Sequence, residues 1–255
     1  MPISIHQFPC LSDNYGYLIH DEASGDTAAI DTPDAVAIEA ALAQKGWRLT
    51  HILNTHWHPD HAGGNLALKE KWKCIVVGPA GEAAKIPGID RTVGEGDIIT
   101  LGAVVGRVVD TPGHTAGHII YHFAEDNAAF VGDTIFALGC GRIFEGTPEQ
   151  RWSSLSKVAA LDPKTMLYCA HEYTLANAKF AVSVDPENAT LGARIEKFKA
   201  MRARDIPTVP MQLADELATN PFLRADDPGL RANLDMAGAD TVAVFAETRR
   251  RKDNF

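Results

Sequence analysis

Apolar and polar residues alternate in short runs up to about residue 170, and this pattern predicts a mixed α/β fold. Strands are expected where the alternation has a period of two or where a short apolar run stands between turns, and helices where apolar residues recur every three to four positions. The predicted strands are residues 3–8, 17–20, 27–31, 49–54, 74–78, 98–101, 104–110, 119–123, 128–131 and 166–170. The predicted helices of this part lie between Pro33-Asp34 and Gly46, from Asn65 to about Trp72, and over about 149–161.

The pattern changes beyond about Leu175, where the strand signals stop. Helices are predicted there at 176–184, 189–203, 211–218 and 241–251, separated by segments that contain proline. We therefore expect a mixed α/β domain at residues 1–172 and a helical domain at residues 173–255.

A dense group of metal-binding side chains follows the predicted strand at 49–54. Residues 55–61 read Thr-His-Trp-His-Pro-Asp-His. In an extended segment side chains alternate between faces, so His56 and His58 should project to the same side. Pro59 then turns the chain toward a helix start, where Asp60 and His61 are adjacent and form a second pair. Imidazole and carboxylate ligands suit zinc, iron or manganese.

Three other predicted strands also end at polar residues that can bind a metal. His114 follows the strand at 104–110, Asp133 follows 128–131, and His171 follows 166–170. A single histidine in such a loop would more often be structural. Four candidate segments at strand ends, one of them dense in histidine, instead favour a metal site at one edge of a sheet. A histidine-rich surface loop without a metal is the alternative.

Composition is ordinary for a soluble globular protein, with 45% hydrophobic and 22% charged residues in a chain of 255. No apolar run approaches the roughly 18 residues that a membrane span needs. The start of the chain has no basic segment leading into an apolar one, so no secretory signal is expected. The scattered cysteines favour reduced thiols and a cytoplasmic location. These are Cys10, Cys74, Cys140 and Cys169. Cys140, between two glycines, is expected in a tight turn and not as a nucleophile.

The formal net charge of −9 argues against broad binding of nucleic acid, which requires a basic surface. The segment Thr248–Asp253, with four consecutive basic residues, is a local exception. Such a cluster can bind a small anion, or it can be a solvated helix end that the helix dipole favours. The residues alone leave both interpretations open.

The candidate metal ligands resemble those of the metallo-β-lactamase superfamily. Further segments are similar to the glyoxalase II (hydroxyacylglutathione hydrolase) family. These are Gly139–Gly146, His171–Thr174, Asn220–Arg224 and Arg249–Phe255. The resemblance covers nearly the whole chain and implies a four-layer αββα sandwich with a helical C-terminal domain that binds glutathione.

The resemblance also implies roles for individual residues. His56, His58 and His114 would bind one divalent ion, Asp60, His61 and His171 a second, and Asp133 would bridge the two. Zinc is the expected metal, with iron and manganese as alternatives. Asp60 and Asp133 would be catalytic, holding the hydroxide shared by the metals against the substrate. The substrate-binding residues would be Arg142, Phe144, Tyr173, Arg249 and Lys252. Phe144 stands where some members of the family have tyrosine.

The activity implied is hydrolysis of S-(2-hydroxyacyl)glutathione thioesters, chiefly of S-D-lactoylglutathione to D-lactate and glutathione, the second step of methylglyoxal detoxification. We expect a cytoplasmic monomer with no nucleic-acid or membrane partner. One alternative, a persulfide dioxygenase with a single iron, would leave His171 and the C-terminal basic residues without a role. A nuclease is disfavoured by the net charge, and a non-catalytic metal-binding protein with this fold is excluded only by an assay.

Overall fold

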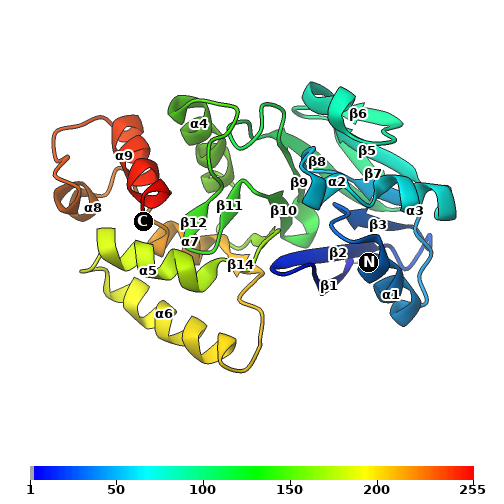
Figure 1. The fold of residues 1–255 in the computed structure, drawn as a ribbon, viewed down its shortest axis with the longest axis horizontal. Helices are drawn as coiled ribbons and strands as arrows, with labels where there is room; N and C mark the ends of the chain where they lie inside the picture. Colours follow the sequence, from blue (N-terminus) through cyan, green and yellow to red (C-terminus); the bar gives the residue numbers. More distant parts are fainter. Residues whose placement is uncertain (1–2) are drawn as a thin grey trace. The chain divides into compact units, whose positions relative to one another are not determined.

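The computed structural model describes residues 3–255, and the chain divides into two compact units. Unit 1 extends to Asp110 and includes Thr115–Gly132. Unit 2 consists of Thr111–His114 and Asp133–Phe255. In Figure 1 the strands of unit 1 run from blue to green, and the helices of unit 2 run from green to red.

Unit 1 contains a six-stranded sheet whose strands follow one another in chain order. The strands are β1 (Ser4–Cys10), β2 (Asn14–His20), β3 (Thr27–Ile30), β4 (His51–Leu53), β5 (Ile75–Pro79) and β6 (Arg91–Val93). The pairs β1–β2 and β2–β3 are antiparallel, whereas β3 to β6 are parallel. Because parallel strands end at the same edge of a sheet, the segments that follow β3, β4 and β5 lie together.

Helices cover one face of this sheet. They are α1 (Ala35–Lys45) and α3 (Asn65–Trp72), and the short α2 (Pro59–Ala62) follows β4 in the chain. The carboxylate of Asp34 caps the first backbone amides of α1, and Gly46 ends that helix in the left-handed conformation (φ 68°). The core of this layer consists mainly of Leu18, Ala29, Ile38, Leu42, Leu49, Ile52, Leu68 and Val76.

Four antiparallel strands cover the other face of the sheet in unit 1. They are β7 (Ile98–Leu101), β8 (Val104–Asp110), β9 (Ile119–Phe123) and β10 (Ala128–Gly132). The short 3₁₀ helix η2 (Ala124–Asp126) connects β9 to β10, and another, η1 (Ala80–Lys85), lies between β5 and β6. The ring of Phe130 lies edge-on to that of Tyr17, with centroids 5.6 Å apart. The hydroxyl of Tyr121 donates to the carbonyl of Asn54 at 2.8 Å. Unit 1 is therefore built of a helical layer and two layers of strands.

Unit 2 is largely helical. Its helices are α4 (Pro148–Ala159), α5 (Thr174–Val184), α6 (Ala189–Arg202), α7 (Leu213–Thr219), α8 (Pro228–Asn233) and α9 (Thr241–Asp253). Two short antiparallel pairs accompany them, β11 (Ile135–Phe136) with β12 (Gly139–Cys140) and β13 (Met166–Cys169) with β14 (Met211–Gln212). Thr147 and Gln150 start α4 with reciprocal caps. Among the described residues, no helix has both the length and the apolar character to cross a membrane.

The structure confirms most predicted elements, and several agree to the residue, including the helix at 65–72 and the strands at 98–101 and 104–110. The helix predicted at 211–218 is confirmed from Leu213 onward as α7, but its predicted start is wrong, because residues 211–212 form β14. Cys140 does not lie in a tight turn but pairs with Ile135 in the β11–β12 hairpin. Strands of two residues are too short to show a period, so the sequence pattern does not reveal them.

Candidate metal centre

Unit 1 brings four predicted ligands together in the segment between β4 and the end of α2. The Nε2 atom of His56 lies 3.0 Å from Nδ1 of His58, so the two side chains project to the same side as predicted. Nε2 of His61 lies 3.6 Å from Oδ2 of Asp60. The ring centroids of His56 and His61 are only 3.9 Å apart, so the two predicted pairs lie in contact with each other. We call His56, His58, Asp60 and His61 the unit 1 cluster.

Hydrogen bonds determine which imidazole nitrogens of this cluster can bind a metal. His61 Nδ1 donates to Oδ2 of the buried Asp31 at 2.8 Å, which leaves the lone pair on Nε2. The hydroxyl of Thr55 also donates to Asp31, at 2.8 Å, so it accepts from Nδ1 of His56, 3.0 Å away. His56 therefore also keeps its lone pair on Nε2. Such partners behind a metal-binding histidine fix the orientation of the ring.

Further buried groups support the same segment. The carboxylate of Glu82 accepts from the backbone amides of Trp57 at 3.1 Å and Gly117 at 2.8 Å. His118 stacks on His56 with ring centroids 4.7 Å apart. None of these residues was predicted from the sequence to support the site. Asp31 is the last residue of the strand predicted at 27–31 and directly follows the observed β3, so attention to polar residues at strand ends could have found it.

Unit 2 brings the other three predicted ligands together. Nε2 of His114 lies 3.2 Å from Oδ2 of Asp133, and Nε2 of His171 lies 3.4 Å from Oδ1 of the same carboxylate. His114 Nδ1 donates to the carbonyl of Arg142 at 3.0 Å, so its lone pair is also on Nε2. We call His114, Asp133 and His171 the unit 2 cluster. Each oxygen of Asp133 faces one imidazole, an arrangement that suits a carboxylate shared by two ions.

The donor atoms of both clusters fit divalent metal ions. All are imidazole nitrogens or carboxylate oxygens, which zinc, iron and manganese accept. The four cysteines are buried and are not in disulfide bonds. Burial raises the pKa of the Cys10 thiol to about 12 and that of the Cys169 thiol further, so both stay protonated. Nitrogen and oxygen donors, with hydrogen bonds that leave the Nε2 lone pairs of His56, His61 and His114 available, are what a site for such ions requires.

Two of the predicted substrate-binding residues are aromatic and lie against the unit 2 cluster. Phe144 is 60% exposed and contacts the ring of His114 edge-on, with centroids 5.2 Å apart. Tyr173, at the start of α5, stacks on His171 with centroids 4.7 Å apart and planes within 3°. The exposure of Phe144 excludes a role in core packing. Both rings are therefore placed to contact a molecule bound beside these histidines.

The three predicted basic residues meet around the end of α9. Nε of Arg142 lies 3.7 Å from Oδ1 of Asp253, and Arg249 donates to the same oxygen at 2.7 Å. Arg249 is only 6% exposed and also donates to the carbonyl of Cys140 at 2.9 Å, so it holds α9 to β12. Lys252 donates to the carbonyl of Ala176 at 3.2 Å. Burial, followed by the charges of Arg249 and Arg142, lowers the pKa of Lys252.

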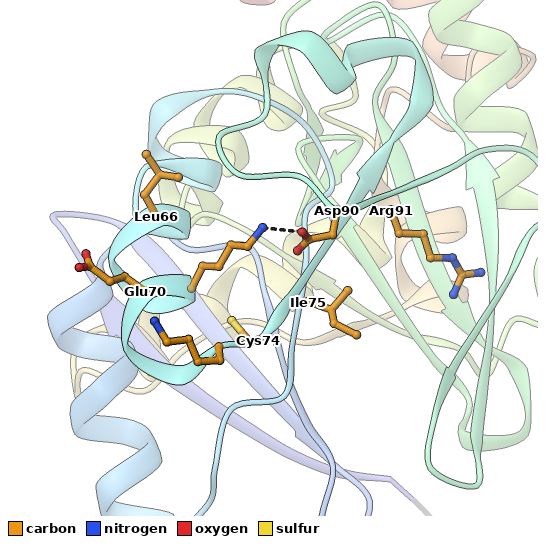
Figure 2. A pocket seen from close by; sticks show the side chains of 8 residues that line it. Leu66, Glu70, Cys74, Ile75, Asp90 and Arg91 are labelled. Carbon is orange, nitrogen blue, oxygen red and sulfur yellow. Dashed lines mark hydrogen bonds and ion pairs between the residues drawn. The ribbon is translucent and has the colours of Figure 1, made fainter.

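A surface hollow of about 890 Å³ lies beside α3 in unit 1 (Figure 2). Its lining consists of Leu66, Lys69, Glu70, Lys73, Cys74, Ile75, Asp90 and Arg91. Lys69 is paired with Asp90 across it at 2.5 Å. None of the residues predicted for the site lines this hollow.

Two family models together match most of the chain. The model described as metallo-beta-lactamase superfamily matches residues 22–171, and that described as hydroxyacylglutathione hydrolase C-terminus matches residues 172–255. The hydroxyacylglutathione hydrolase of Hyphomonas neptunium is 57% identical over 253 residues, which cover 99% of this chain and 98% of that protein. The one from Erythrobacter litoralis is 58% identical over 253 residues, covering 99% and 100%.

The solved structures show the same fold. The crystal structure of ETHE1 from Myxococcus xanthus superposes with a TM-score of 0.69 at 26% identity, covering 98% of this chain and 90% of that one. The predicted fold class, a metallo-β-lactamase fold of mixed α/β layers with a helical C-terminal region, is thereby confirmed. The chain belongs to the hydroxyacylglutathione hydrolase family, within the metallo-β-lactamase superfamily.

Proposed function

We propose that this chain hydrolyses S-(2-hydroxyacyl)glutathione thioesters, chiefly S-D-lactoylglutathione, to the 2-hydroxy acid and glutathione. The observation that carries the proposal is the identity of 57% and 58% with hydroxyacylglutathione hydrolases over nearly the whole chain. The match includes the helical region from residue 172, which the family model assigns to the C-terminus of these hydrolases. We propose that residues 173–255 form the glutathione-binding domain.

The two clusters would together hold two divalent ions. In this proposal His56, His58 and His114 bind one ion, Asp60, His61 and His171 bind the other, and Asp133 bridges them. The Nε2 lone pairs of His56, His61 and His114 support it, as does the carboxylate of Asp133 between two imidazoles. When bound, such ions lower the pKa of water to about 7 and polarise a carbonyl oxygen. Zinc is the proposed metal, in a cytoplasmic monomer.

The carboxylates would orient the attacking water. Asp60 is 38% exposed and accepts from Nδ2 of Asn14 at 3.2 Å, so one oxygen is fixed while the group still faces solvent. Asp133 is 9% exposed and faces His114 and His171. The leaving group is a thiolate whose thiol has a pKa of about 8.5, by analogy with cysteine. It leaves without a general acid, and the proposal requires none.

Substrate recognition would come from unit 2. Phe144 and Tyr173 offer exposed ring surface beside His114 and His171, against which the glutathione chain can pack. Arg142, Arg249 and Lys252 place three positive charges near Asp253 and α5. Glutathione carries a net negative charge, so a local basic group favours it on a chain whose formal net charge is −9.

The test is an assay of the purified protein with S-D-lactoylglutathione, together with elemental analysis for metal. We expect loss of the thioester absorbance, release of free thiol in equal amount, and two ions per chain. The same preparation is then given glutathione persulfide while oxygen is monitored, and no oxygen uptake is expected. Oxygen uptake with one iron per chain and no thioester hydrolysis would refute the proposal in favour of a dioxygenase.

A further inference from the structure

Arg151, in the first turn of α4, is fully buried, with 0% of its surface exposed. Its Nη2 atom donates to the backbone carbonyls of Asp133 at 2.6 Å and Thr134 at 2.7 Å, with that of Gly141 at 3.5 Å. Among the described residues its Nε and Nη1 atoms have no hydrogen-bond partner. The hydrogen bonds of this buried cation are thus concentrated on the segments that carry the metal ligands. Burying a charge costs free energy, and the hydrogen bonds to these carbonyls offset part of that cost.

The same side chain fills the space between these segments. A Cβ atom at Gly113, next to His114, would lie 2.9 Å from Cδ of Arg151. A Cβ at Gly141, next to Arg142, would lie 3.0 Å from Nη2. Glycine at 113 therefore leaves room for the arginine, whereas a Cβ at 141 would meet the carbonyl oxygen of Asp133 first, at 2.2 Å. Ser154, also on α4, donates to the carbonyl of Pro112 at 2.8 Å.

These contacts bear on the orientation of Asp133. Two consecutive carbonyls, those of Asp133 and Thr134, turn toward one nitrogen, which fixes the peptide planes on both sides of Thr134. The direction in which the side chain of Asp133 leaves the backbone depends on the first of these planes. Burial lowers the pKa of Arg151, and the neighbouring Cys140 and Asp133 act in the opposite direction.

We propose that Arg151 is a positioning residue for metal binding: it holds the backbone of Asp133 so that the carboxylate faces His114 and His171. The inference rests on the proposed function, because it takes Asp133 to be a metal ligand. The alternative is that Arg151 only stabilises unit 2. The two differ in what happens to a folded variant, since a purely stabilising residue leaves the metal affinity of the folded protein unchanged.

The test compares Arg151→Met and Arg151→Lys with Arg224→Met as the matched control. Arg224 is also largely buried: it donates to the carbonyl of Ala218 at 3.1 Å and pairs with Asp227 at 2.9 Å and Asp185 at 3.3 Å. Within the described part of the chain, it makes no hydrogen bond to either cluster. For each metal-loaded protein, the chelator concentration that removes half of the ions, kcat, KM and Tm are measured. Wild type is measured first, and a wild type without metal or thioesterase activity would defeat the proposed function alone.

Loss of a group that orients a metal ligand weakens metal binding by about 10–100-fold, and this is expected for folded Arg151→Met. Its kcat should fall while KM stays within about twofold, because the arginine does not touch substrate. Arg151→Lys keeps a charge and a donor, so its metal affinity and kcat should lie between those of wild type and Arg151→Met. Arg224→Met should lower Tm yet retain metal like wild type.

Three outcomes would overturn the inference. The first is a folded Arg151→Met that retains metal and turns over like wild type. The second is equal metal loss in Arg224→Met, which would show that metal loss follows stability. The third is failure of both Arg151 variants to fold, which would assign the residue to stability. If only Arg151→Met fails to fold, Arg151→Lys decides, and undiminished metal retention in it counts against the proposal.

Discussion

His61 and Asp31 form a buried pair in which Nδ1 of the imidazole lies 2.8 Å from Oδ2 of the carboxylate. Asp31 is held in turn by Thr55, whose amide donates to Oδ1 at 2.7 Å and whose hydroxyl donates to Oδ2 at 2.8 Å. Asp31 has a left-handed backbone (φ 57°), which is uncommon outside glycine, asparagine and aspartate. Because Asp31 is held in this conformation and bonded at both oxygens, it fixes the orientation of the His61 ring.

Asp31→Asn should weaken metal binding without unfolding the protein. Asparagine has the same size and tolerates the left-handed backbone, but it has only one acceptor oxygen for the donors that Asp31 now satisfies with two. We expect metal retention against a chelator to fall about 10–100-fold. The matched control is Asp34→Asn, which keeps the cap of α1 and should change nothing. Equal retention in both variants would contradict the role of Asp31.

Asp133→Ala should lose at least one metal ion per chain and nearly all turnover. The reason is that this carboxylate faces both His114 and His171 and, as proposed, serves both ions. Elemental analysis and the thioester assay on the same sample provide the measurement. Asp133→Asn keeps one oxygen ligand and should retain more metal than the alanine variant. Full activity in Asp133→Ala would refute the dinuclear centre.

The sequence predicts a feature of the fold or the site when the interactions behind it join residues that are close together in the chain. His56 and His58 were correctly placed on one side because alternation along an extended segment is local. Helix α1 was delimited by Asp34 and Gly46, which act within one turn of their positions. Strand β14 could not be predicted, because its two residues owe their conformation to pairing with β13, more than forty residues earlier in the chain.

Glu82 and Arg151, two supporting residues of the site, were missed for the same reason. Glu82 accepts from the amide of Gly117, and Arg151 donates to the carbonyl of Asp133, so both depend on partners far along the chain. Neither leaves a pattern in its own neighbourhood. The basic residues of α9 were predicted only as a cluster. Whether each is exposed or buried depends on β12 and α5, which the local sequence does not specify.

Arg249 and Lys252 should separate stability from substrate binding. Arg249 is buried and bonded to Cys140 and Asp253, so removing its charge affects the stability of the fold. Hydrogen bonds of charged groups contribute about 1.5–3 kcal/mol each, and 1 kcal/mol shifts Tm by about 2–4 °C in a chain of this size. Arg249→Met should therefore lower Tm by several degrees.

Lys252→Met should instead raise KM about tenfold or more, the loss expected for one charge-assisted hydrogen bond, with little change in Tm. Steady-state kinetics and thermal melts on the two single variants provide the comparison. An unchanged KM in Lys252→Met would remove this residue from the substrate site. A Tm equal to that of wild type in Arg249→Met would mean that its buried bonds contribute nothing to stability.

Binding of glutathione derivatives should weaken as pH rises, and it should do so at a lower pH than the titration of an ordinary lysine would predict. Burial and the neighbouring arginines lower the pKa of Lys252 from 10.5, so its charge is present at neutral pH and is lost as pH rises through a value below 10.5. Calorimetry with a non-hydrolysable S-alkylglutathione avoids spontaneous thioester cleavage. In Lys252→Arg the charge persists, and the alkaline weakening should disappear. If the profile of the arginine variant matches that of wild type, another group is responsible.

Phe144→Tyr should tighten substrate binding without changing turnover. The ring is 60% exposed beside His114, so an added hydroxyl reaches solvent or the glutathione chain and is not buried. One neutral hydrogen bond contributes about 0.5–1.5 kcal/mol, which corresponds to a KM about two- to twelvefold lower. The contact lies away from the reacting carbonyl and acts equally on ground and transition states, so kcat should stay constant. A higher KM would show that the hydroxyl obstructs the substrate.

Strands β3, β4 and β5 are parallel, and Asp31, Thr55 and Glu82 follow their carboxyl ends. The opposite edge of the same sheet carries none of these supporting groups. There the turn between β2 and β3 exposes Ala23 and Ser24, and Gly25 has open space around its Cα. A dye or surface tether attached at Ala23 would therefore report on single molecules from the far edge of the sheet while the histidines keep their geometry.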